Sequence, residues 1–425
     1  MAELPRPEPS RSSRWVALLF LSLAMFGNYY VYDSIAPVAD LLAKQLGFSN
    51  ADIGWLQAIY NFPNIFMVVV GGYVVDRIGV RRALLIFGAI CFAGSAITVL
   101  SGTLKVMAAG RLVFGLGAES LIVAVTTAIA KWFRGKDLSF AFGVQLMLAR
   151  FGTWLAQNSP TWARGVYESW RGPLLISVVF GGICFLGAVL YWWMEAHTER
   201  KFALGQQGST DKLVFQDIFD FGLSYWYIVA LCVVFYAAIF PFETFAIKFF
   251  IEAHGTSREL GGFLVSILTA FTMFGTPAFG LLADRIGRRA LLMMFGSTLL
   301  IPVYLMMAYT HISLYVPMAM MGIAFSLIPA VMWPSVAYLV DQSKLGTAYG
   351  LMTMLQNIGF GGLNLVIGWA NDHSQASAAH PEGYRLGMWI FSVLGFLGVF
   401  FAFLLRQRET GPHGHGLETI TAKAG

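Results

Sequence analysis

The chain has 425 residues, of which 57% are hydrophobic and only 12% are charged, and its formal net charge is +5. Soluble globular proteins carry about 25% charged residues, so this composition excludes an ordinary soluble protein and indicates a membrane protein. The three cysteines lie singly in apolar runs, without the paired spacing of a metal site. We therefore expect no metal and no cofactor.

Apolar runs of about 20 residues, long enough to cross a bilayer, recur about twelve times along the chain. The predicted transmembrane helices cover, in order, residues 15–43, 52–75, 83–101, 105–130, 138–163, 172–195, 224–251, 259–282, 290–309, 313–340, 346–370 and 385–405. The sequence thus predicts an all-α protein that crosses a lipid bilayer many times.

Basic residues are distributed unevenly between the loops of this arrangement. With both termini on the inner side, 19 of the 28 Lys and Arg residues fall in inner loops and tails, 6 in outer loops and 3 within spans. Short loops rich in Lys and Arg stay in the cytoplasm, so both termini are predicted to be cytoplasmic. The positive charge is then a topology signal, and we expect no nucleic-acid partner.

A short motif, Gly-x-x-x-Asp-Arg-x-Gly, occurs twice, once after the second span and once after the eighth, 208 residues later. This repeat divides the chain into two six-helix halves, residues 1–195 and 223–408, joined by a cytoplasmic linker, 196–222, and followed by a polar tail, 409–425. Parallel repeats of six helices are an arrangement of secondary transporters.

The motif also predicts a role for its own residues. Gly79 and Gly287 are expected to form tight turns, because glycine adopts positive φ without strain. We expect the charged residues of the two copies, Asp76, Arg77, Asp284 and Arg285, to act as inner gates. Arg111 in the fourth span is grouped with them: we expect it to pack and to form ion pairs, with contact to the substrate as the alternative. The alternative for the two loops is a static role.

Two opposite charges stand out near the middle of consecutive predicted spans. Glu119 lies near the centre of the fourth span and Arg150 near the centre of the fifth. An unpaired charge at that depth costs about 2.5–3.5 kcal/mol on insertion scales. Three interpretations are open: a closed Glu–Arg salt bridge, a proton-coupling glutamate, or a binding site for a ligand with two oppositely charged ends.

Other polar residues within the spans are candidates for the wall of such a site: Tyr29, Tyr30, Asp33, Asn64 and Gln356. The alternatives are hydrogen bonds between helices and, for Asp33, an ion pair with a basic residue such as Lys248. The run from Phe240 to Glu243 contains Pro241, which we expect to break the seventh span. For Glu243 and Lys248, an outer gate and a binding role both remain open.

Catalytic signatures are missing from the sequence. Its histidines lie in loops and in the tail, and it has neither a Ser/His/Asp arrangement nor a phosphate-binding loop. We therefore predict neither an enzyme nor an ATP-driven pump.

The repeated loop resembles the best-known signature of the major facilitator superfamily. The segments 110–120, 131–136, 143–146, 149–152 and 345–350 also resemble a narrower group, the family of major facilitator superfamily domain-containing protein 1. That resemblance implies the major facilitator fold and a lysosomal dipeptide carrier that works as a uniporter. It further implies that Glu119 and Arg150 hold the amino and carboxyl ends of the peptide.

The chain departs from the mammalian members of that family in two respects: it shows no acidic dileucine sorting signal before the first span, and no Asn-x-Ser/Thr glycosylation site. We therefore expect a bacterial relative in the inner membrane, with the lysosomal membrane as the alternative, and no accessory subunit. The predicted function is secondary transport of dipeptides by alternating access, as a uniporter or coupled to protons. The alternatives are a carrier for another small organic anion, such as a monocarboxylate or sugar acid, and a membrane sensor that transports nothing.

Overall fold

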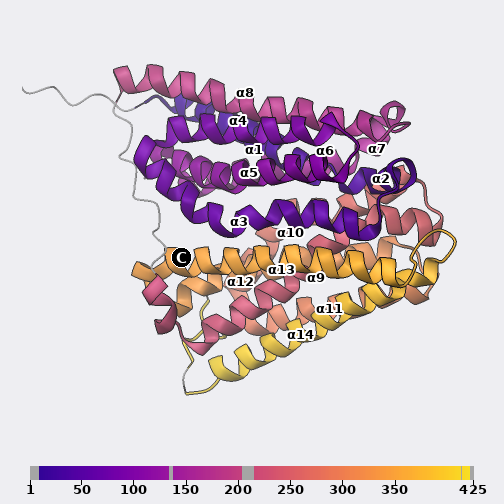
Figure 1. Ribbon diagram of the computed structural model, residues 1–425. Helices are drawn as coiled ribbons and strands as arrows, with labels where there is room; N and C mark the ends of the chain where they lie inside the picture. Colours follow the sequence, from indigo (N-terminus) through magenta and orange to yellow (C-terminus); the bar gives the residue numbers. More distant parts are fainter. Residues whose placement is uncertain (1–8, 134–136, 203–214, 413, 422–425) are drawn as a thin grey trace, which may run out of the picture. The chain divides into compact units, whose positions relative to one another are not determined.

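The computed structural model describes residues 9–133, 137–202, 215–412 and 414–421, and these are all-helical apart from turns and one isolated β-bridge (Figure 1). Twelve of the described helices have 20 residues or more: α1 (Arg11–Asp33), α3 (Asn50–Ile78), α4 (Val80–Leu100), α5 (Leu104–Phe133), α6 (Leu138–Gln157), α8 (Arg171–Lys201), α9 (Leu223–His254), α10 (Arg258–Ile286), α11 (Arg289–Tyr309), α12 (Tyr315–Leu339), α13 (Leu345–His373) and α14 (Arg385–Glu409). The remaining elements are short: η1 (Ala36–Val38), α2 (Ala39–Leu46), α7 (Ser159–Trp162), η2 (Arg164–Val166), η3 (Phe215–Asp220), η4 (Gln342–Lys344) and η5 (Pro381–Tyr384).

Length and hydropathy identify most of these helices as membrane spans. Among the described residues, 10 helices are long and apolar enough to cross a bilayer, and α3 makes 11 if its two parts, bent by 53°, count as one span. Large apolar side chains such as Phe62, Phe274 and Phe396 are exposed on the helix surfaces, where lipid would surround them. The all-helical, multi-pass class predicted from the sequence is confirmed.

The chain forms two compact units, which differ from the two sequence halves at the outer ends of the helices. Unit 1 comprises Met1–Ile35, Ile59–Ala156 and Gly165–Lys212, and unit 2 comprises Ala36–Ala58, Gln157–Arg164 and Leu213–Gly425. The predicted linker, 196–222, begins within α8, ends beyond η3 and includes residues 203–214, which lie outside the described part. Its role as a divider therefore stays a prediction.

Unit 1 is held together by close packing of its long helices. Helix α4 packs against α5 and α8, and α1 packs against α8 and α5 (Figure 1). At the inner end, Lys131 bridges two carboxylates of α8, with Nζ 2.5 Å from Glu195 and 2.8 Å from Glu199. Arg81 of α4 also reaches Glu199, at 3.4 Å. This cluster ties the inner ends of three helices together.

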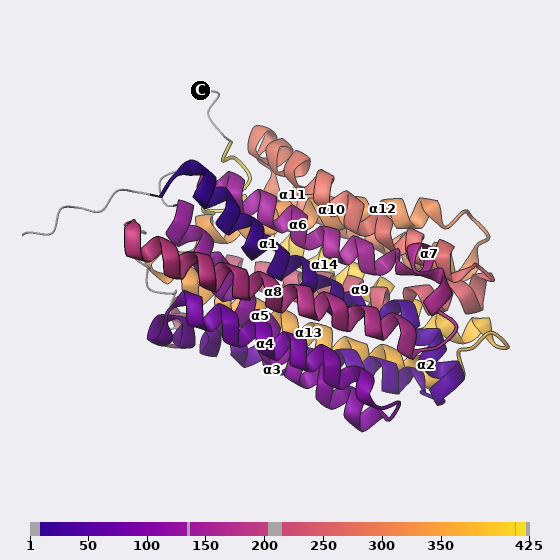
Figure 2. The same ribbon diagram turned by 90° about the horizontal axis from the view of Figure 1, so that it is seen from above.

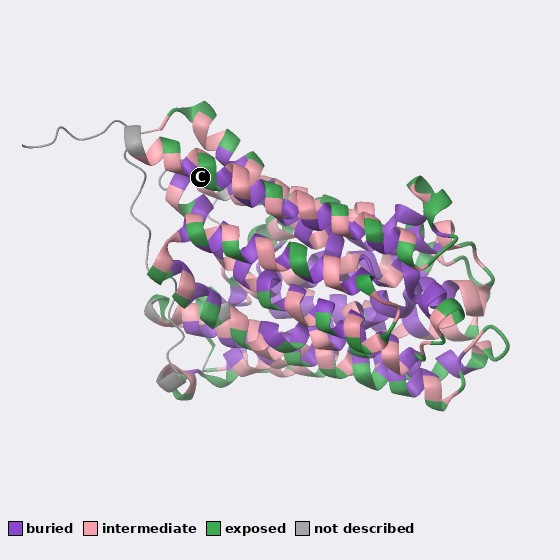
Figure 3. Ribbon diagram, turned by 45° about the horizontal axis from the view of Figure 1, so that its top comes forward, coloured by how far each residue is buried: buried purple, intermediate pink, exposed green. Residues whose placement is uncertain are grey.

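Unit 2 is built around α9, the most buried of the described spans, which packs against α10, α12, α13 and α14. Helices α10, α11 and α12 are neighbours in the same unit (Figure 2). Buried positions run along the helices of each unit (Figure 3). Pro241 lies inside α9 without interrupting it, so the expected break in the seventh span does not occur. A hydrogen bond from Tyr304 to the carbonyl of Ala238, at 2.6 Å, supports the turn before the proline.

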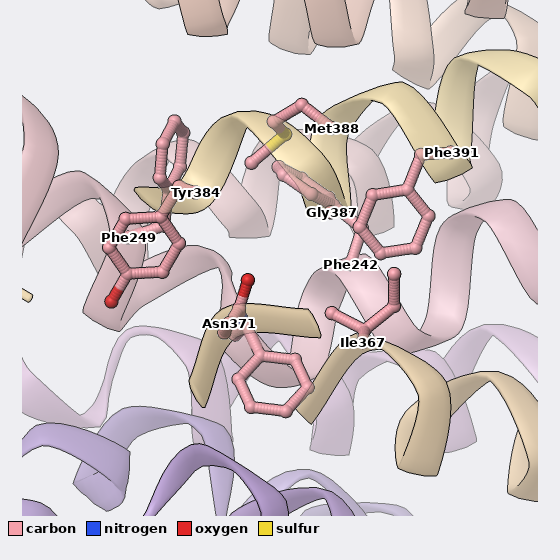
Figure 4. Close-up of a pocket in the computed structure, with 9 residues that line it drawn as sticks. Phe242, Phe249, Ile367, Asn371, Tyr384, Gly387, Met388 and Phe391 are labelled. Carbon is pink, nitrogen blue, oxygen red and sulfur yellow. The ribbon is translucent and has the colours of Figure 1, made fainter. Parts of the chain in front are cut away.

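Unit 2 also contains a small apolar pocket between α9, α13, η5 and α14 (Figure 4). Its walls are Phe242, Phe245, Phe249, Ile367, Asn371, Tyr384, Gly387, Met388 and Phe391. The pocket has room for a water molecule but not for a peptide. It is therefore too small for the dipeptide substrate that the sequence predicts.

Candidate functional site

The two opposite charges that the sequence predicts to lie near the bilayer midplane belong to unit 1, on the consecutive helices α5 and α6. Glu119 lies at the middle of α5, and Arg150 lies on α6. Both side chains are partly exposed, although α5 is otherwise largely buried. Tyr29 of α1 lies in the electrostatic field of both, and of Asp33. The structure thus gathers four of the predicted site residues into one cluster, contributed by α1, α5 and α6.

Aromatic and carboxylate groups from α1 surround Arg150. The guanidinium carbon of Arg150 lies 5.6 Å from the centre of the Tyr29 ring, within the range of cation–π attraction. Asp33, the last residue of α1, interacts electrostatically with Arg150 and Arg111 and lies beside Thr153. Arg150 is therefore held on one side by α1.

The negative charge of Glu119 has fewer compensating groups around it than the positive charge of Arg150. Among the described residues it has no ion-pair or hydrogen-bond partner, and the groups in its field are the phenols of Tyr29 and Tyr60. A closed Glu119–Arg150 salt bridge, one of the three interpretations above, is not formed in this structure. A lone carboxylate at that depth carries an energetic cost that a cationic ligand group or a proton would relieve.

The other two predicted residues of unit 1 are more deeply buried. Tyr30 is 1% exposed and stacks on Phe180 of α8, with ring centroids 3.7 Å apart. Asn64 is 0% exposed and lies on α3, one turn from Tyr60. In this structure both pack inside the unit, and their participation in binding stays a prediction. Gln356 belongs to unit 2, where its side-chain oxygen accepts from the Cys232 thiol at 3.7 Å.

Arg111 caps the C-terminal end of α1 with its side chain. Its side chain is 1% exposed, and it donates to the carbonyls of Val31 and Tyr32 at 3.1 and 3.2 Å. These carbonyls belong to the last turn of α1, where the helix dipole is negative, so a cation there is stabilising. Arg111 therefore fixes the end of α1 that carries Asp33, and its predicted gating role remains untested.

The repeated inner loops have the turns that the motif predicts. Gly79 and Gly287 both have positive φ, 83° and 64°, between consecutive helices, so the predicted tight turns are confirmed. Arg77 donates to the hydroxyl of Tyr73 at 3.1 Å, and both Asp76 and Arg77 are exposed. Whether this first loop gates transport stays a prediction.

The second loop makes its contacts within unit 2. Asp284 pairs with Arg289 at 3.0 Å, while Arg285 is exposed. Residues of the C-terminal tail cover this loop: Glu418 accepts from the backbone N–H of Ala290 at 2.6 Å, and the buried side chain of Leu417 joins the core. Sequence reasoning treated 409–425 only as a polar tail and missed this docking.

Lys248 is engaged at the outer end of unit 2, with Asn50, Glu252 and Tyr384. The predicted alternative of an Asp33–Lys248 pair is therefore not observed. Glu243 accepts from the amide of Gln157, at 3.5 Å. Sequence reasoning missed Asn50 and Asp372, because a single polar residue at a helix end carries no signal before the helices are packed.

Comparison with known proteins identifies the family. A sequence profile of the Major Facilitator Superfamily matches residues 21–362 and 244–421, which together cover most of the chain. The chain belongs to the major facilitator superfamily. The twelve long helices of its described part and its repeated inner loops are therefore those of a major facilitator transporter: a multi-pass membrane protein that moves a small molecule and is not an enzyme.

Individual relatives agree with this assignment. The human lysosomal dipeptide transporter MFSD1 is 32% identical over 423 residues, covering 95% of this chain and 89% of that protein. The hexuronate transporter of Escherichia coli is 26% identical over 184 residues, covering 43% of this chain and 42% of that protein. A solved bacterial homolog of the human lysosomal transporter Spinster, inward-facing and unoccupied, superimposes with a TM-score of 0.76 at 18% identity, covering 94% of this chain and 98% of that one. The major facilitator fold is thereby confirmed.

Proposed function

We propose that this major facilitator transporter carries dipeptides by alternating access, as a uniporter or coupled to protons. The proposal is supported by the similarity to MFSD1 over nearly the whole chain and by one structural observation. That observation is the presence of a carboxylate, Glu119, and a guanidinium, Arg150, in one cluster without a Glu119 ion pair among the described residues.

The chemistry of the two charges suits the two ends of a dipeptide. Arg150 offers a planar set of N–H donors that holds a carboxylate through two parallel bonds. Glu119 accepts from an ammonium group, and Asp33 supplies a second carboxylate in the same cluster. A zwitterion brings one compensating charge to each, which lowers the cost of keeping both groups inside the membrane.

A ligand screen on the purified full chain tests the proposal. Thermal unfolding would be followed with dipeptides, free amino acids, N-acetylated dipeptides and organic acids, since a ligand that binds the folded state raises its melting temperature. We expect stabilisation by dipeptides, and its loss when the amino group is acetylated. Glu119→Gln and Arg150→Ala should abolish the shift, whereas Glu382→Gln, at a side chain 56% exposed, should retain it. Dipeptides that fail to stabilise the parent protein would contradict the proposal.

A second candidate is a carrier for a sugar acid or another small organic anion, favoured by the partial similarity to the hexuronate transporter. In that case Arg150 holds the anion and Glu119 takes up a proton. The screen separates the two, because organic acids would then stabilise the protein and dipeptides would not. Uptake into liposomes separates both from a sensor that transports nothing.

As part of the same proposal, we place the transporter in a bacterial inner membrane and without an accessory subunit. The chain contains no glycosylation site, whereas lysosomal membrane proteins pass through glycosylating compartments. Membrane fractionation of the source cells tests the location. Dipeptide uptake by the purified single chain in liposomes tests its independence from a partner.

A further inference from the structure

The outer ends of the two sequence halves are joined within unit 2. That unit contains residues 36–58 and 157–164 from the first half, packed with the helices of the second half. Alternating access requires the outer ends of the halves to separate in each cycle. We propose that Asn50, Lys248 and Asp372, called the outer lock below, hold this end closed and that their separation opens the transporter to the outside. This inference rests on transport by alternating access, not on the dipeptide assignment.

Asn50 is the centre of the outer lock, because both ends of its side chain are bound by the second half. Its amide nitrogen donates to Asp372 at 2.9 Å, and its oxygen accepts from Nζ of Lys248 at 2.9 Å. Asn50 itself is 6% exposed. No other residue type of this size offers a donor and an acceptor in the same plane.

Asp372 adds a helix cap that crosses from one half to the other. Besides the Asn50 side chain, it accepts from the backbone N–H groups of Asn50 and Ala51, at 2.8 and 2.7 Å. These are the first two N–H groups of α3, which have no partner within that helix. A carboxylate from the end of α13 thus satisfies the positive start of α3, and opening removes three charge-assisted bonds at once.

Lys248 is arranged so that opening leaves it partly satisfied. Its ammonium group has three donors, which reach Asn50, Glu252 and Tyr384. The last two belong to the second half, and Tyr384 also donates to Glu252 at 2.5 Å. When the halves part, only the bond to Asn50 is broken. The ammonium group of Lys248 therefore keeps two hydrogen-bond partners when the transporter opens, and it can bind Asn50 again when the transporter closes.

Glycines bring the backbones close enough for these bonds. A Cβ on Gly54 would lie 2.3 Å from the carbonyl oxygen of Asn364, and one on Gly368 would lie 2.7 Å from that of Asn50. Helices α3 and α13 therefore cross in direct backbone contact at this end.

A second set of contacts joins residues 36–46 and 157–164 to α9 and α10. Asp40 is 1% exposed and pairs with Arg258 at 2.6 Å. Gln157 accepts from Thr269 at 2.7 Å, and its carbonyl would lie 2.3 Å from a Cβ on Gly262. These contacts close the same end from another side, so the outer lock does not act in isolation.

Cysteine labelling of the full-length protein tests the proposal without a substrate. The outer reporter is Ile53→Cys, placed at a fully buried position of α3 next to the outer lock, in a background whose three native cysteines are replaced. Labelling of this introduced thiol by a membrane-impermeant maleimide, applied from outside to proteoliposomes, should be slow in the parent. When Asp372→Ala or Asn50→Ala is added, the labelling rate should rise by about tenfold or more, because several bonds to a charged group are lost.

Two controls make the outcome decisive. Asp341→Ala, at an exposed inner-side aspartate, should leave the labelling rate of the outer reporter unchanged. A core reporter, Met318→Cys, lies in the core of the second half and should stay unlabelled in every variant. Unchanged labelling of the outer reporter, or an equal rise at the core reporter that signals loss of the fold, would overturn the proposal.

A wedge at the helix crossing gives an independent test. In Gly368→Val the side chain would meet the backbone of Asn50 and Ala51, whereas Gly362 on the same helix has nothing within 4 Å of its Cβ position. Gly368→Val should raise labelling of the outer reporter as Asp372→Ala does, and Gly362→Val should not. Equal labelling in the two valine variants would also overturn the proposal. None of these readouts depends on which substrate is carried.

Discussion

Charged residues within the long helices have two kinds of environment in this protein, one with an ion-pair partner and one without. At the inner end of unit 1, the side chains of Lys131 and Glu195 are both largely shielded from solvent, and Nζ of Lys131 lies 2.5 Å from Oε1 of Glu195. At the middle of α5, Glu119 has no ion pair among the described residues. The first arrangement uses its charges for structure, whereas under the proposed function the second leaves a carboxylate that the ammonium group of a substrate would bind.

The proposed role of Arg150 leads to a prediction about geometry. Arg150→Lys keeps the charge but removes the planar, two-bond contact with a carboxylate. We expect the dissociation constant for a dipeptide to rise by about tenfold or more. Isothermal titration with purified protein measures it, with Arg164→Lys as the control, because the Arg164 side chain is 82% exposed. An unchanged affinity in Arg150→Lys would argue against carboxylate recognition by this residue.

The Lys131–Glu195 pair leads to a prediction about stability. Removing one partner of a buried ion pair costs about 3–5 kcal/mol, because the other is left uncompensated. Lys131→Met should therefore lower the thermal midpoint clearly, since Glu195 is 1% exposed. The double variant Lys131→Met/Glu195→Gln should recover part of the loss. A double variant less stable than Lys131→Met would contradict this account.

At the scale of elements, the C-terminal tail acts as a strap on the turn between α10 and α11. The turn contains Arg288, a non-glycine residue with φ of 48°, a conformation that is strained for such a residue. The backbone N–H of Arg288 donates to the carbonyl of Glu418, at 3.0 Å, and Arg289 donates to the carbonyl of Ile420. The tail therefore stabilises a turn that the local sequence alone favours weakly.

Removal of the tail should expose this turn. We expect a chain truncated after Thr410 to be cut by trypsin at Arg285 and Arg288 several times faster than the full chain, since local opening precedes cleavage. Mass spectrometry of the early fragments measures it. Thr419→Ala serves as the control, because the Thr419 hydroxyl donates to the carbonyl of Gly416, within the tail itself. Equal cleavage rates in the truncated and full chains would show that the strap has no such effect.

At the scale of the whole molecule, the proposed site binds the charged amino and carboxyl ends of its substrate and not the side chains of the substrate. Dipeptides with small, large, polar and apolar side chains should therefore bind with dissociation constants within about tenfold of one another, a spread of ~1.4 kcal/mol. Competition for uptake into proteoliposomes measures this series. A preference of more than about a hundredfold for one side chain would point to a selective pocket that the midplane charges do not explain.

Much of the fold was predictable from the chain because its signals are local or periodic. Apolar runs indicate helices that lie in lipid, since every backbone polar group must be paired inside the same segment. The two copies of the Asp-Arg-x-Gly loop predicted two tandem halves, a division that stays a prediction. Gly79 and Gly287 marked turns that need positive φ. Counting residues predicted a shared depth for Glu119 and Arg150; the structure has Glu119 at the middle of α5 and Arg150 in the second half of α6.

The outer contacts were not predictable in the same way. Asn50 and Asp372 are separated by 322 residues, and neither belongs to a motif that connects them. Their partnership follows from which helix ends meet once the helices have packed, and so does the docking of Glu418 on Ala290, 128 residues earlier in the chain. The pattern of polar and apolar residues predicts whether a segment lies in lipid or in water. The partner of a polar group depends on three-dimensional proximity, which is set by the packing of all the helices together.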